Sequence, residues 1–174
     1  MPSTIDTVTG MPSLAVAVID IEASGFGRGS YPIEIGFVTA TGRAACTLVR
    51  PEPDWTHWDP AAEAVHGIAR ETALRHGRGA EEVARWLNCE LAGQVVYCDG
   101  WAHDYTWLGV LYEAAGLQPR FRLEHILRLL DVDQARRLGP LRQAVWSKAP
   151  GTRHRASSDA RLLQRALTEV LAPA

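Results

Sequence analysis

Two acidic residues, Asp20 and Glu22, interrupt the most apolar stretch of this 174-residue sequence. The stretch Leu14–Glu22 is rich in valine and isoleucine and predicts a buried β-strand. Side chains two positions apart on a strand share a face, about 6.6–7 Å apart. Two carboxylates so placed repel each other and lose hydration unless a cation lies between them. Mg²⁺ or Mn²⁺ fits that need; a strand end that emerges into solvent is the alternative, and these two residues alone leave both open.

Three more residues with chemically useful side chains lie near the ends of predicted elements. Asp104 follows an apolar strand, Gln94–Cys98, and His154 and Asp159 flank the start of the last predicted helix. Each has an ordinary alternative role, because acids and serines at a helix N-terminus satisfy its free N–H groups. Together with Asp20 and Glu22, however, they form a constellation that these ordinary roles explain poorly.

The elements that must position these residues alternate between strands and helices. The dipeptide Thr41-Gly42 separates two β-type runs and predicts a hairpin, so the first three strands are expected to be antiparallel. Asp59-Pro60 and Gly67 are typical of a helix start and a helix end. The remaining predicted strands lie at Pro32–Ala40, Arg43–Arg50 and Phe121–Leu123, and the remaining helices at Ala69–His76, Ala80–Leu91, Asp104–Ala115 and about Ser157–Leu171, with one or two more between the last two. This order predicts an α/β fold with a single mixed sheet covered by helices.

Composition is that of an ordinary globular domain. The hydrophobic fraction is 47% and the charged fraction 22%, and no apolar run reaches the roughly 18 residues that a membrane span needs. Three cysteines without a CxxC pair argue against a zinc site or a disulfide framework and favour buried, reduced thiols in a cytoplasmic protein. We expect a loose leader at residues 1–12 and a single domain at 13–172.

Charge is divided unevenly along the chain. Residues 1–118 carry a net charge of -8 and residues 119–174 a net charge of +6. Such a split is compatible with an acidic metal site beside a basic surface for a polyanion. The opposing interpretation is codon bias, since 17 arginines stand against one lysine.

Four motifs, in order, carry a resemblance to a known family. The segments are Val18–Phe26 with Asp-x-Glu, Ala64–Ile68 with His66-Gly67-Ile68, Asp104–Leu108 with an Asp followed by a Leu, and His154–Ala160 with His-x4-Asp. From about Leu14 to Leu163 the sequence resembles the DEDDh group of 3′–5′ exonucleases, in the ribonuclease T-like branch of the ribonuclease H-like superfamily. The fold implied is a central mixed five-stranded sheet flanked by helices, with the first three strands antiparallel.

The resemblance also implies a mechanism. Asp20, Glu22, Asp104 and Asp159 would hold two Mg²⁺ or Mn²⁺ ions, with Asp20 bridging them, and His154 would be the general base for the attacking water. The reaction would hydrolyse phosphodiester bonds from the 3′ end of a nucleic acid and release nucleoside 5′-monophosphates. The expected partner is RNA or DNA with a free 3′ end, single-stranded, with no membrane and with a homodimer as one oligomeric state.

Further residues are implicated in substrate binding. In the family, the turn after the first motif meets the terminal sugar and an apolar residue stacks on the end base, which points to Ala23, Ser24 and Phe26; packing under a loop is the alternative for Phe26. His66 would line the site or close its helix. Arg153 and Arg155 would contact phosphate or lie on the surface as ordinary arginines. Among the tryptophans, Trp55, Trp58 and Trp101 are candidate stacking platforms, whereas Trp86, Trp107 and Trp146 are expected in the core.

The sequence departs from the family motif at one place, and three other functions compete with the one that the resemblance implies. The family often has His-Asn before the second-motif acid, where this sequence has Asp99-Gly100, so substrate contacts there are less securely transferred. A glycosidase would need only two of the carboxylates and no His154. The second rival is a non-catalytic nucleic-acid- or protein-binding module on the same fold, and the third is a proofreading exonuclease subunit of a DNA polymerase.

Overall fold

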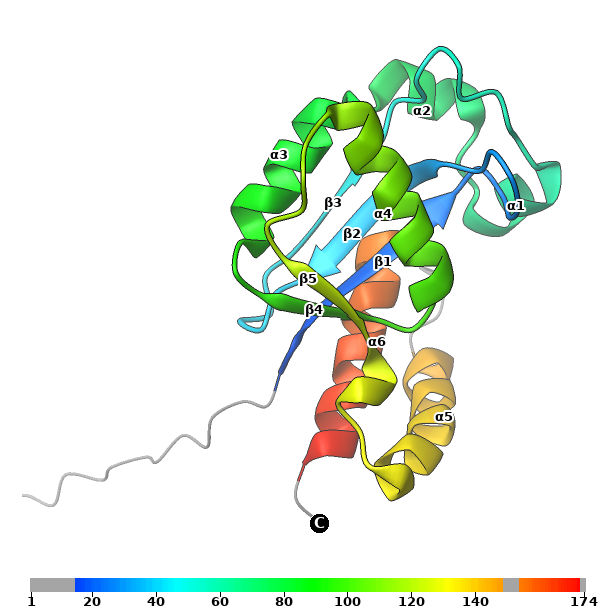
Figure 1. Cartoon of the computed structure of the whole chain (residues 1–174). Helices are drawn as coiled ribbons and strands as arrows, with labels where there is room; N and C mark the ends of the chain where they lie inside the picture. Colours follow the sequence, from blue (N-terminus) through cyan, green and yellow to red (C-terminus); the bar gives the residue numbers. More distant parts are fainter. Residues whose placement is uncertain (1–14, 149–153, 173–174) are drawn as a thin grey trace, which may run out of the picture.

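A five-stranded mixed sheet forms the centre of this computed structural model, which describes residues 15–148 and 154–172 (Figure 1). Its strands are β1 (Ala17–Ala23), β2 (Pro32–Val38), β3 (Ala44–Leu48), β4 (Val95–Cys98) and β5 (Arg122–His125). They lie in the order β3-β2-β1-β4-β5. The first three are antiparallel, whereas β4 and β5 run parallel to β1. The predicted α/β class and sheet are therefore confirmed.

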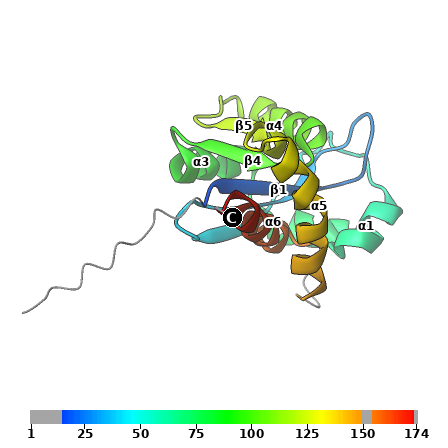
Figure 2. The same ribbon diagram turned by 90° about the horizontal axis from the view of Figure 1, so that it is seen from below.

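Helices cover both faces of the sheet (Figure 2). They are α1 (Pro60–His66), α2 (Arg70–His76), α3 (Ala80–Leu91), α4 (Trp101–Ala115), a 3₁₀ turn η1 (Ile126–Arg128), α5 (Val132–Ser147) and α6 (Ala156–Leu171). Local signals set several ends: the Asp59 side chain accepts from the Ala61 N–H at 2.8 Å, and Gly67 takes the left-handed conformation at φ 69°. No helix among the described residues is long and apolar enough to span a membrane.

The prediction for the start of α4 was wrong by three residues. The helix begins at Trp101, after an N-cap, Gly100, that has no side chain to act as a cap. Asp104 therefore sits at the end of the first turn, and its side chain does not cap the helix.

The two faces of β1 have different surroundings. Ile19 and Ile21 belong to the core formed with α3 and α4, whereas Val18 belongs to the core formed with α5 and α6. Side chains alternate along a strand, so Asp20 and Glu22 share the face of Val18 and point toward α6. The burial of the odd-numbered positions thus fixes where the acids go.

A glycine in β2 brings α6 close to these acids. Gly36 lies opposite Asp20 in the β1–β2 register. A Cβ atom on Gly36 would lie 2.2 Å from the backbone nitrogen of Ser157, so any side chain would push the start of α6 away from the sheet.

Cysteine placement differs in part from expectation. Cys98 is buried in the core, but Cys46 and Cys89 are exposed, and all three are free thiols. The prediction of three buried thiols is thus wrong for two of them, because both sit on solvent-facing positions of β3 and α3.

Candidate active site

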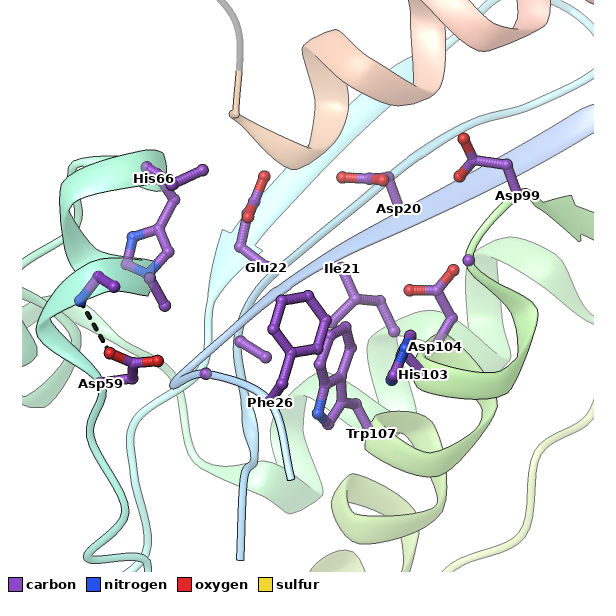
Figure 3. Close-up of a pocket in the computed structure, with 16 residues that line it drawn as sticks. Asp20, Ile21, Glu22, Phe26, Asp59, His66, Asp99, His103, Asp104 and Trp107 are labelled. Atoms are coloured by element: carbon purple, nitrogen blue, oxygen red, sulfur yellow. Dashed lines mark hydrogen bonds between the residues drawn. The ribbon is translucent and has the colours of Figure 1, made fainter. Parts of the chain in front are cut away.

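A cleft of about 400 Å³ opens at the carboxyl end of β1 (Figure 3). Because β1, β4 and β5 are parallel, their carboxyl ends meet at one edge of the sheet, and this is the edge that the cleft occupies. Asp20 and Glu22 reach it from β1 and Asp104 from the first turn of α4. Further residues of β1, α1 and α4 and of the segments that connect them complete the lining: Ile21, Ala23, Gly25, Phe26, Asp59, Ala61, Ala62, Val65, His66, Asp99, Gly100, His103 and Trp107.

His154 and Asp159 reach Glu22 from the start of α6. Donor atoms of Glu22, His154 and Asp159 all lie within 4.8 Å of one another, an arrangement that could hold a metal ion. The His154 backbone N–H donates to Asp159 Oδ2 at 2.9 Å, and His154 adopts a φ of 63°. A non-glycine residue in this region of backbone space carries strain, which the Asp159 hydrogen bond helps to offset.

Electrostatics at the cleft disfavour carboxylate ionisation. Burial, followed by the charges of Asp104 and Glu22, raises the pKa of Asp20 well above its usual value. Burial, followed by the charge of Asp159, raises the pKa of Glu22 to about 7. Burial is also the main cause that raises the pKa of Asp104 to about 7. The acids therefore crowd one another in a poorly hydrated place, a condition that a bound cation would relieve.

The donor set fits hard divalent ions. Carboxylate oxygens are the ligands that Mg²⁺ and Mn²⁺ prefer, and each of Asp20, Glu22 and Asp104 lacks an ion pair among the described residues. Asp20 and Asp104 are near enough for the charge of one to raise the pKa of the other, as ligands of a shared site would be.

Arg155, expected at phosphate or on the surface, is engaged within the protein. Its guanidinium donates to the Glu34 carboxylate at 2.6 and 3.1 Å, and the Ala156 N–H donates to the same carboxylate at 2.9 Å. Glu34 is only 1% exposed and lies directly opposite Glu22 in the β1–β2 register. The pair ties the start of α6 to β2 and offsets the like charges of Glu22 and Glu34, which otherwise repel across the strands.

Asp99, the departure from the family pattern, also has a cationic partner. Arg142 of α5 pairs with it at 2.6 Å, and the same guanidinium lies 4.3 Å from the centre of the Trp146 ring. The extra acid beside the cleft is thus neutralised by the chain itself.

Aromatic residues gather on the floor of the cleft next to Asp104 (Figure 3). Phe26 is 67% exposed, and its ring centroid lies 4.9 Å from that of His103 and 5.9 Å from that of Trp107. Trp107 is anchored by a hydrogen bond from its Nε1 to Ser30 Oγ at 2.9 Å. Packing under a loop does not describe such an exposed ring, and the placement agrees with a stacking role.

His66 lies in the cleft with an unused polar atom. Its Nδ1 accepts from the Ile68 N–H at 3.0 Å, so in the neutral ring the hydrogen is on Nε2. Among the described residues Nε2 has no hydrogen-bond partner, and burial lowers the pKa of the ring. Both interpretations of His66 are therefore compatible: the residue ends α1, and it also lines the cleft.

Of the other residues predicted to bind substrate, one lines the cleft, one has its side chain buried away from it, and one lies outside the described residues. Ala23 lines the cleft, but the Ser24 side chain is buried away from it, where it accepts from the Tyr31 N–H and shares a hydrogen bond with His57. The expected contact with the terminal sugar is made by the backbone of this turn, so the role of Ser24 in binding stays a prediction. Arg153 and the leader at 1–12 lie outside the described residues.

The six tryptophans were predicted to fall into core residues and candidate stacking platforms. Trp86, Trp107 and Trp146 pack against the two main cores, as expected. Trp55 and Trp58 are partly buried beside Tyr31, whereas Trp101 is exposed; their use as stacking platforms stays a prediction.

Sequence reasoning missed the residues that support this site. Glu34, Gly36 and Arg142 act through partners more than forty positions away. Trp107 was expected only in the core, and His103 was not singled out. The one signal in the sequence was Glu34 itself, an acid in a strand that is otherwise apolar.

Only the comparison of structures finds known proteins similar to this chain. No family model and no curated protein matches the sequence. The structure matches the zinc-bound complex of E. coli exonuclease I with single-stranded DNA at a TM-score of 0.70 and 14% identity, covering 88% of this chain and 39% of that one. For E. coli exonuclease I with a dT13 oligonucleotide the values are 0.68, 14%, 89% and 40%.

A smaller protein aligns over most of both chains. The Mg²⁺- and Mn²⁺-bound form of S. pombe Pop2p matches with a TM-score of 0.63 and 15% identity, covering 90% of this chain and 82% of that one. By contrast, the chain spans about two fifths of the length of exonuclease I. The chain therefore shares the fold of E. coli exonuclease I and S. pombe Pop2p.

Proposed function

We propose that this chain is a metal-dependent 3′–5′ exonuclease that removes nucleoside 5′-monophosphates from single-stranded nucleic acid. The observation that carries the proposal is the convergence of four acids and a histidine on one edge of the sheet, three of the acids with no cationic partner among the described residues. A glycosidase would leave Asp104, Asp159 and His154 without a purpose.

Asp20, Glu22, Asp104 and Asp159 would hold two Mg²⁺ or Mn²⁺ ions, with Asp20 between them. When bound, such ions lower the pKa of water and offset charge on the attacking and leaving oxygens. The four carboxylates would hold the cations that attract the scissile phosphate, and their mutual repulsion would end once they act as ligands.

His154 would accept the proton of the attacking water on an imidazole nitrogen. The water oxygen bonds to phosphorus as the P–O3′ bond breaks, and the released 3′ oxygen takes up a proton from solvent. The backbone hydrogen bond to Asp159 fixes His154 at the rim beside Glu22, where a general base must stand within hydrogen-bond reach of the water.

The terminal nucleoside would lie between α1 and α4. Phe26, backed by His103 and Trp107 of α4, offers a face for its base. His66 lines the cleft from the end of α1. A cleft of about 400 Å³ is large enough for a nucleoside.

A single assay tests the proposal. Purified protein with Mg²⁺ or Mn²⁺ is given 5′-labelled single-stranded RNA, single-stranded DNA and blunt duplex. A ladder that shortens nucleotide by nucleotide from the 3′ end, lost in His154→Ala and kept in the exposed control His76→Ala, is the expected result. Internal cuts alone, or no cleavage of any substrate, would overturn it.

A further inference from the structure

Trp101 and Tyr105 form a stacked aromatic pair on the surface of α4. Their ring centroids lie 5.1 Å apart with an interplanar angle of 28°. Trp101 is 38% exposed and Tyr105 59% exposed. Residues four positions apart lie on the same face of a helix. Neither ring belongs to a hydrophobic cluster of the described residues, so core packing does not account for the pair.

Contacts with β5 hold the pair in place. Trp101 Nε1 donates to the Leu123 carbonyl at 3.5 Å. Tyr105 forms one wall of a groove of about 500 Å³ that Phe121 and Leu123 also line. A fixed aromatic ring loses little conformational entropy when a ligand stacks on it.

The pair lies on the opposite side of Asp104 from the aromatic group in the cleft. At about 100° per residue, Trp101 and Tyr105 project about 60° and 100° to one side of Asp104. By the same geometry His103 and Trp107 project about 100° and 60° to the other side, next to Phe26 (Figure 3). The α4 helix therefore presents one aromatic surface inside the cleft and a second just outside it.

The end of the cleft beside this second surface carries a fixed cation. Asp99 and Gly100 line that end and directly precede Trp101. Arg142 reaches the same point through its ion pair with Asp99 and is steadied by the Trp146 ring. The exposed aromatic face matches the base of a nucleotide, and the Arg142–Asp99 pair keeps the charge of Asp99 from repelling the phosphate beside it.

We propose that the Trp101–Tyr105 pair is a second nucleobase-binding site, on which a base of the single strand 5′ to the scissile bond stacks. The inference rests on the proposed function and adds that the protein holds several nucleotides rather than the terminal one alone. Every base has a π-face, so such a platform recognises a single strand without selecting its sequence.

Binding to the metal-free protein tests the site without any cleavage. In EDTA, fluorescence anisotropy follows 5′-fluorescein oligothymidylates of about two to about eight nucleotides. Changing Trp101→Ala and Tyr105→Ala together is expected to weaken binding of the longest probe by roughly 5- to 150-fold and to abolish the gain in affinity with length. Trp101→Phe with Tyr105→Phe keeps both aromatic faces and should retain binding. Leu74→Ala, which removes an exposed apolar side chain from α2, is the matched control and should leave binding unchanged.

Each result has a definite meaning. A protein that binds the long probe through the pair but never cuts it contradicts the proposed function and leaves this site standing. Equal affinity in the double alanine variant, at an unchanged melting temperature, overturns the site, and so does a wild type that binds no oligonucleotide. If the alanine changes instead dissociate a dimer in light scattering while oligonucleotide affinity is kept, the pair is a protein interface and the proposal fails.

Discussion

Acidic residues around the carboxyl end of β1 fall into two groups that differ in what neutralises them. In the first group, each acid has an arginine from the C-terminal third of the chain. Glu34 is paired with Arg155 and Asp99 with Arg142, each at 2.6 Å. These acids fix the positions of α6 and α5 relative to the sheet.

The second group has no such partner. Asp20, Glu22 and Asp104 form no ion pair with an arginine of the described residues, although two arginines stand close by. Burial and mutual repulsion raise the pKa of each. The chain thus supplies arginines for the acids that hold its parts together and, in its described part, forms no ion pair with the acids of the second group. This difference is what the proposed metal site predicts, and an ordinary acidic surface does not require it.

The largest expected effect comes from removing an acid of the second group. Asp20→Asn should lower nuclease activity by roughly 10³-fold or more, because the ions hold charge that develops in the transition state. The same change should abolish the rise in melting temperature that Mn²⁺ gives to the wild type. Differential scanning fluorimetry with and without Mn²⁺, beside the nuclease assay, measures both.

A matched control separates the site from general charge effects. Asp133→Asn removes an acid of the same type from an exposed ion pair on α5 and should leave activity and Mn²⁺ stabilisation as they are. If Asp20→Asn keeps the Mn²⁺ response, the distinction between the two groups of acids is wrong.

Breaking the Glu34–Arg155 pair is expected to have the next largest effect, and an unequal one. Arg155→Gln strands a buried carboxylate and should lower the free energy of unfolding by about 3 kcal/mol. Glu34→Gln should cost only about 1 kcal/mol, since the Arg155 side chain, 51% exposed, can turn to water. Urea unfolding gives both values.

The exposed Arg85–Glu81 pair supplies the comparison. Arg85→Gln should change stability by less than about 1 kcal/mol because water screens that pair. Equal losses in Arg155→Gln and Glu34→Gln would contradict the view that Glu34 is the buried member that needs a partner.

Raised carboxylate pKa values predict that the metal-free protein loses stability as pH rises. Between the unfolded pKa near 4 and a folded pKa of about 7 for Asp104 and Glu22, the native state binds more protons than the unfolded state. Stability is thus full at low pH and falls through this window, by on the order of 3 kcal/mol for one such group. Thermal melts in EDTA from pH 5 to about 8 measure the slope.

Two further measurements sharpen that result. Asp104→Asn should flatten the slope and raise stability at the high-pH end, and saturating Mn²⁺ should cancel the slope in the wild type. A metal-free protein that gains stability over the same range would show that these acids are not strained by burial.

Prediction from sequence succeeded where the signals were local. The β1–β3 strands followed from apolar runs and Thr41-Gly42, and α1 from Asp59-Pro60 and Gly67, because each turn or cap lies within a few residues of what it ends. Asp20 and Glu22, two acids in an apolar strand, also indicated a candidate cation site from the sequence alone.

What could not be predicted depended on distant pairing. Glu34 and Arg155 are 121 positions apart, and no local sequence pattern at either residue predicts that they form a pair. Gly36 is required only because α6 returns to β2 beside Asp20. The start of α4 was misplaced because Gly100 gives no capping side chain to detect.

The smallest expected effect concerns the second arginine pair. Arg142→Gln leaves Asp99 unpaired at the rim of the cleft, where its charge already acts on Asp20 and Asp104. The added negative potential should tighten Mn²⁺ binding and raise the KM for an oligonucleotide, each by roughly three- to tenfold, as for about 1 kcal/mol of charge interaction. Isothermal titration calorimetry and initial rates measure the two opposite shifts.

Restoring the charge balance identifies the cause. Adding Asp99→Asn to Arg142→Gln removes both members of the pair, so Mn²⁺ affinity should return toward the wild-type value because the stranded charge is gone. The KM should recover only if Arg142 serves chiefly to neutralise Asp99; a KM that stays high assigns the guanidinium a direct contact with substrate phosphate. Shifts of the same sign in Mn²⁺ affinity and oligonucleotide affinity for Arg142→Gln would contradict the electrostatic account, because one added negative charge must attract the cation and repel the polyanion.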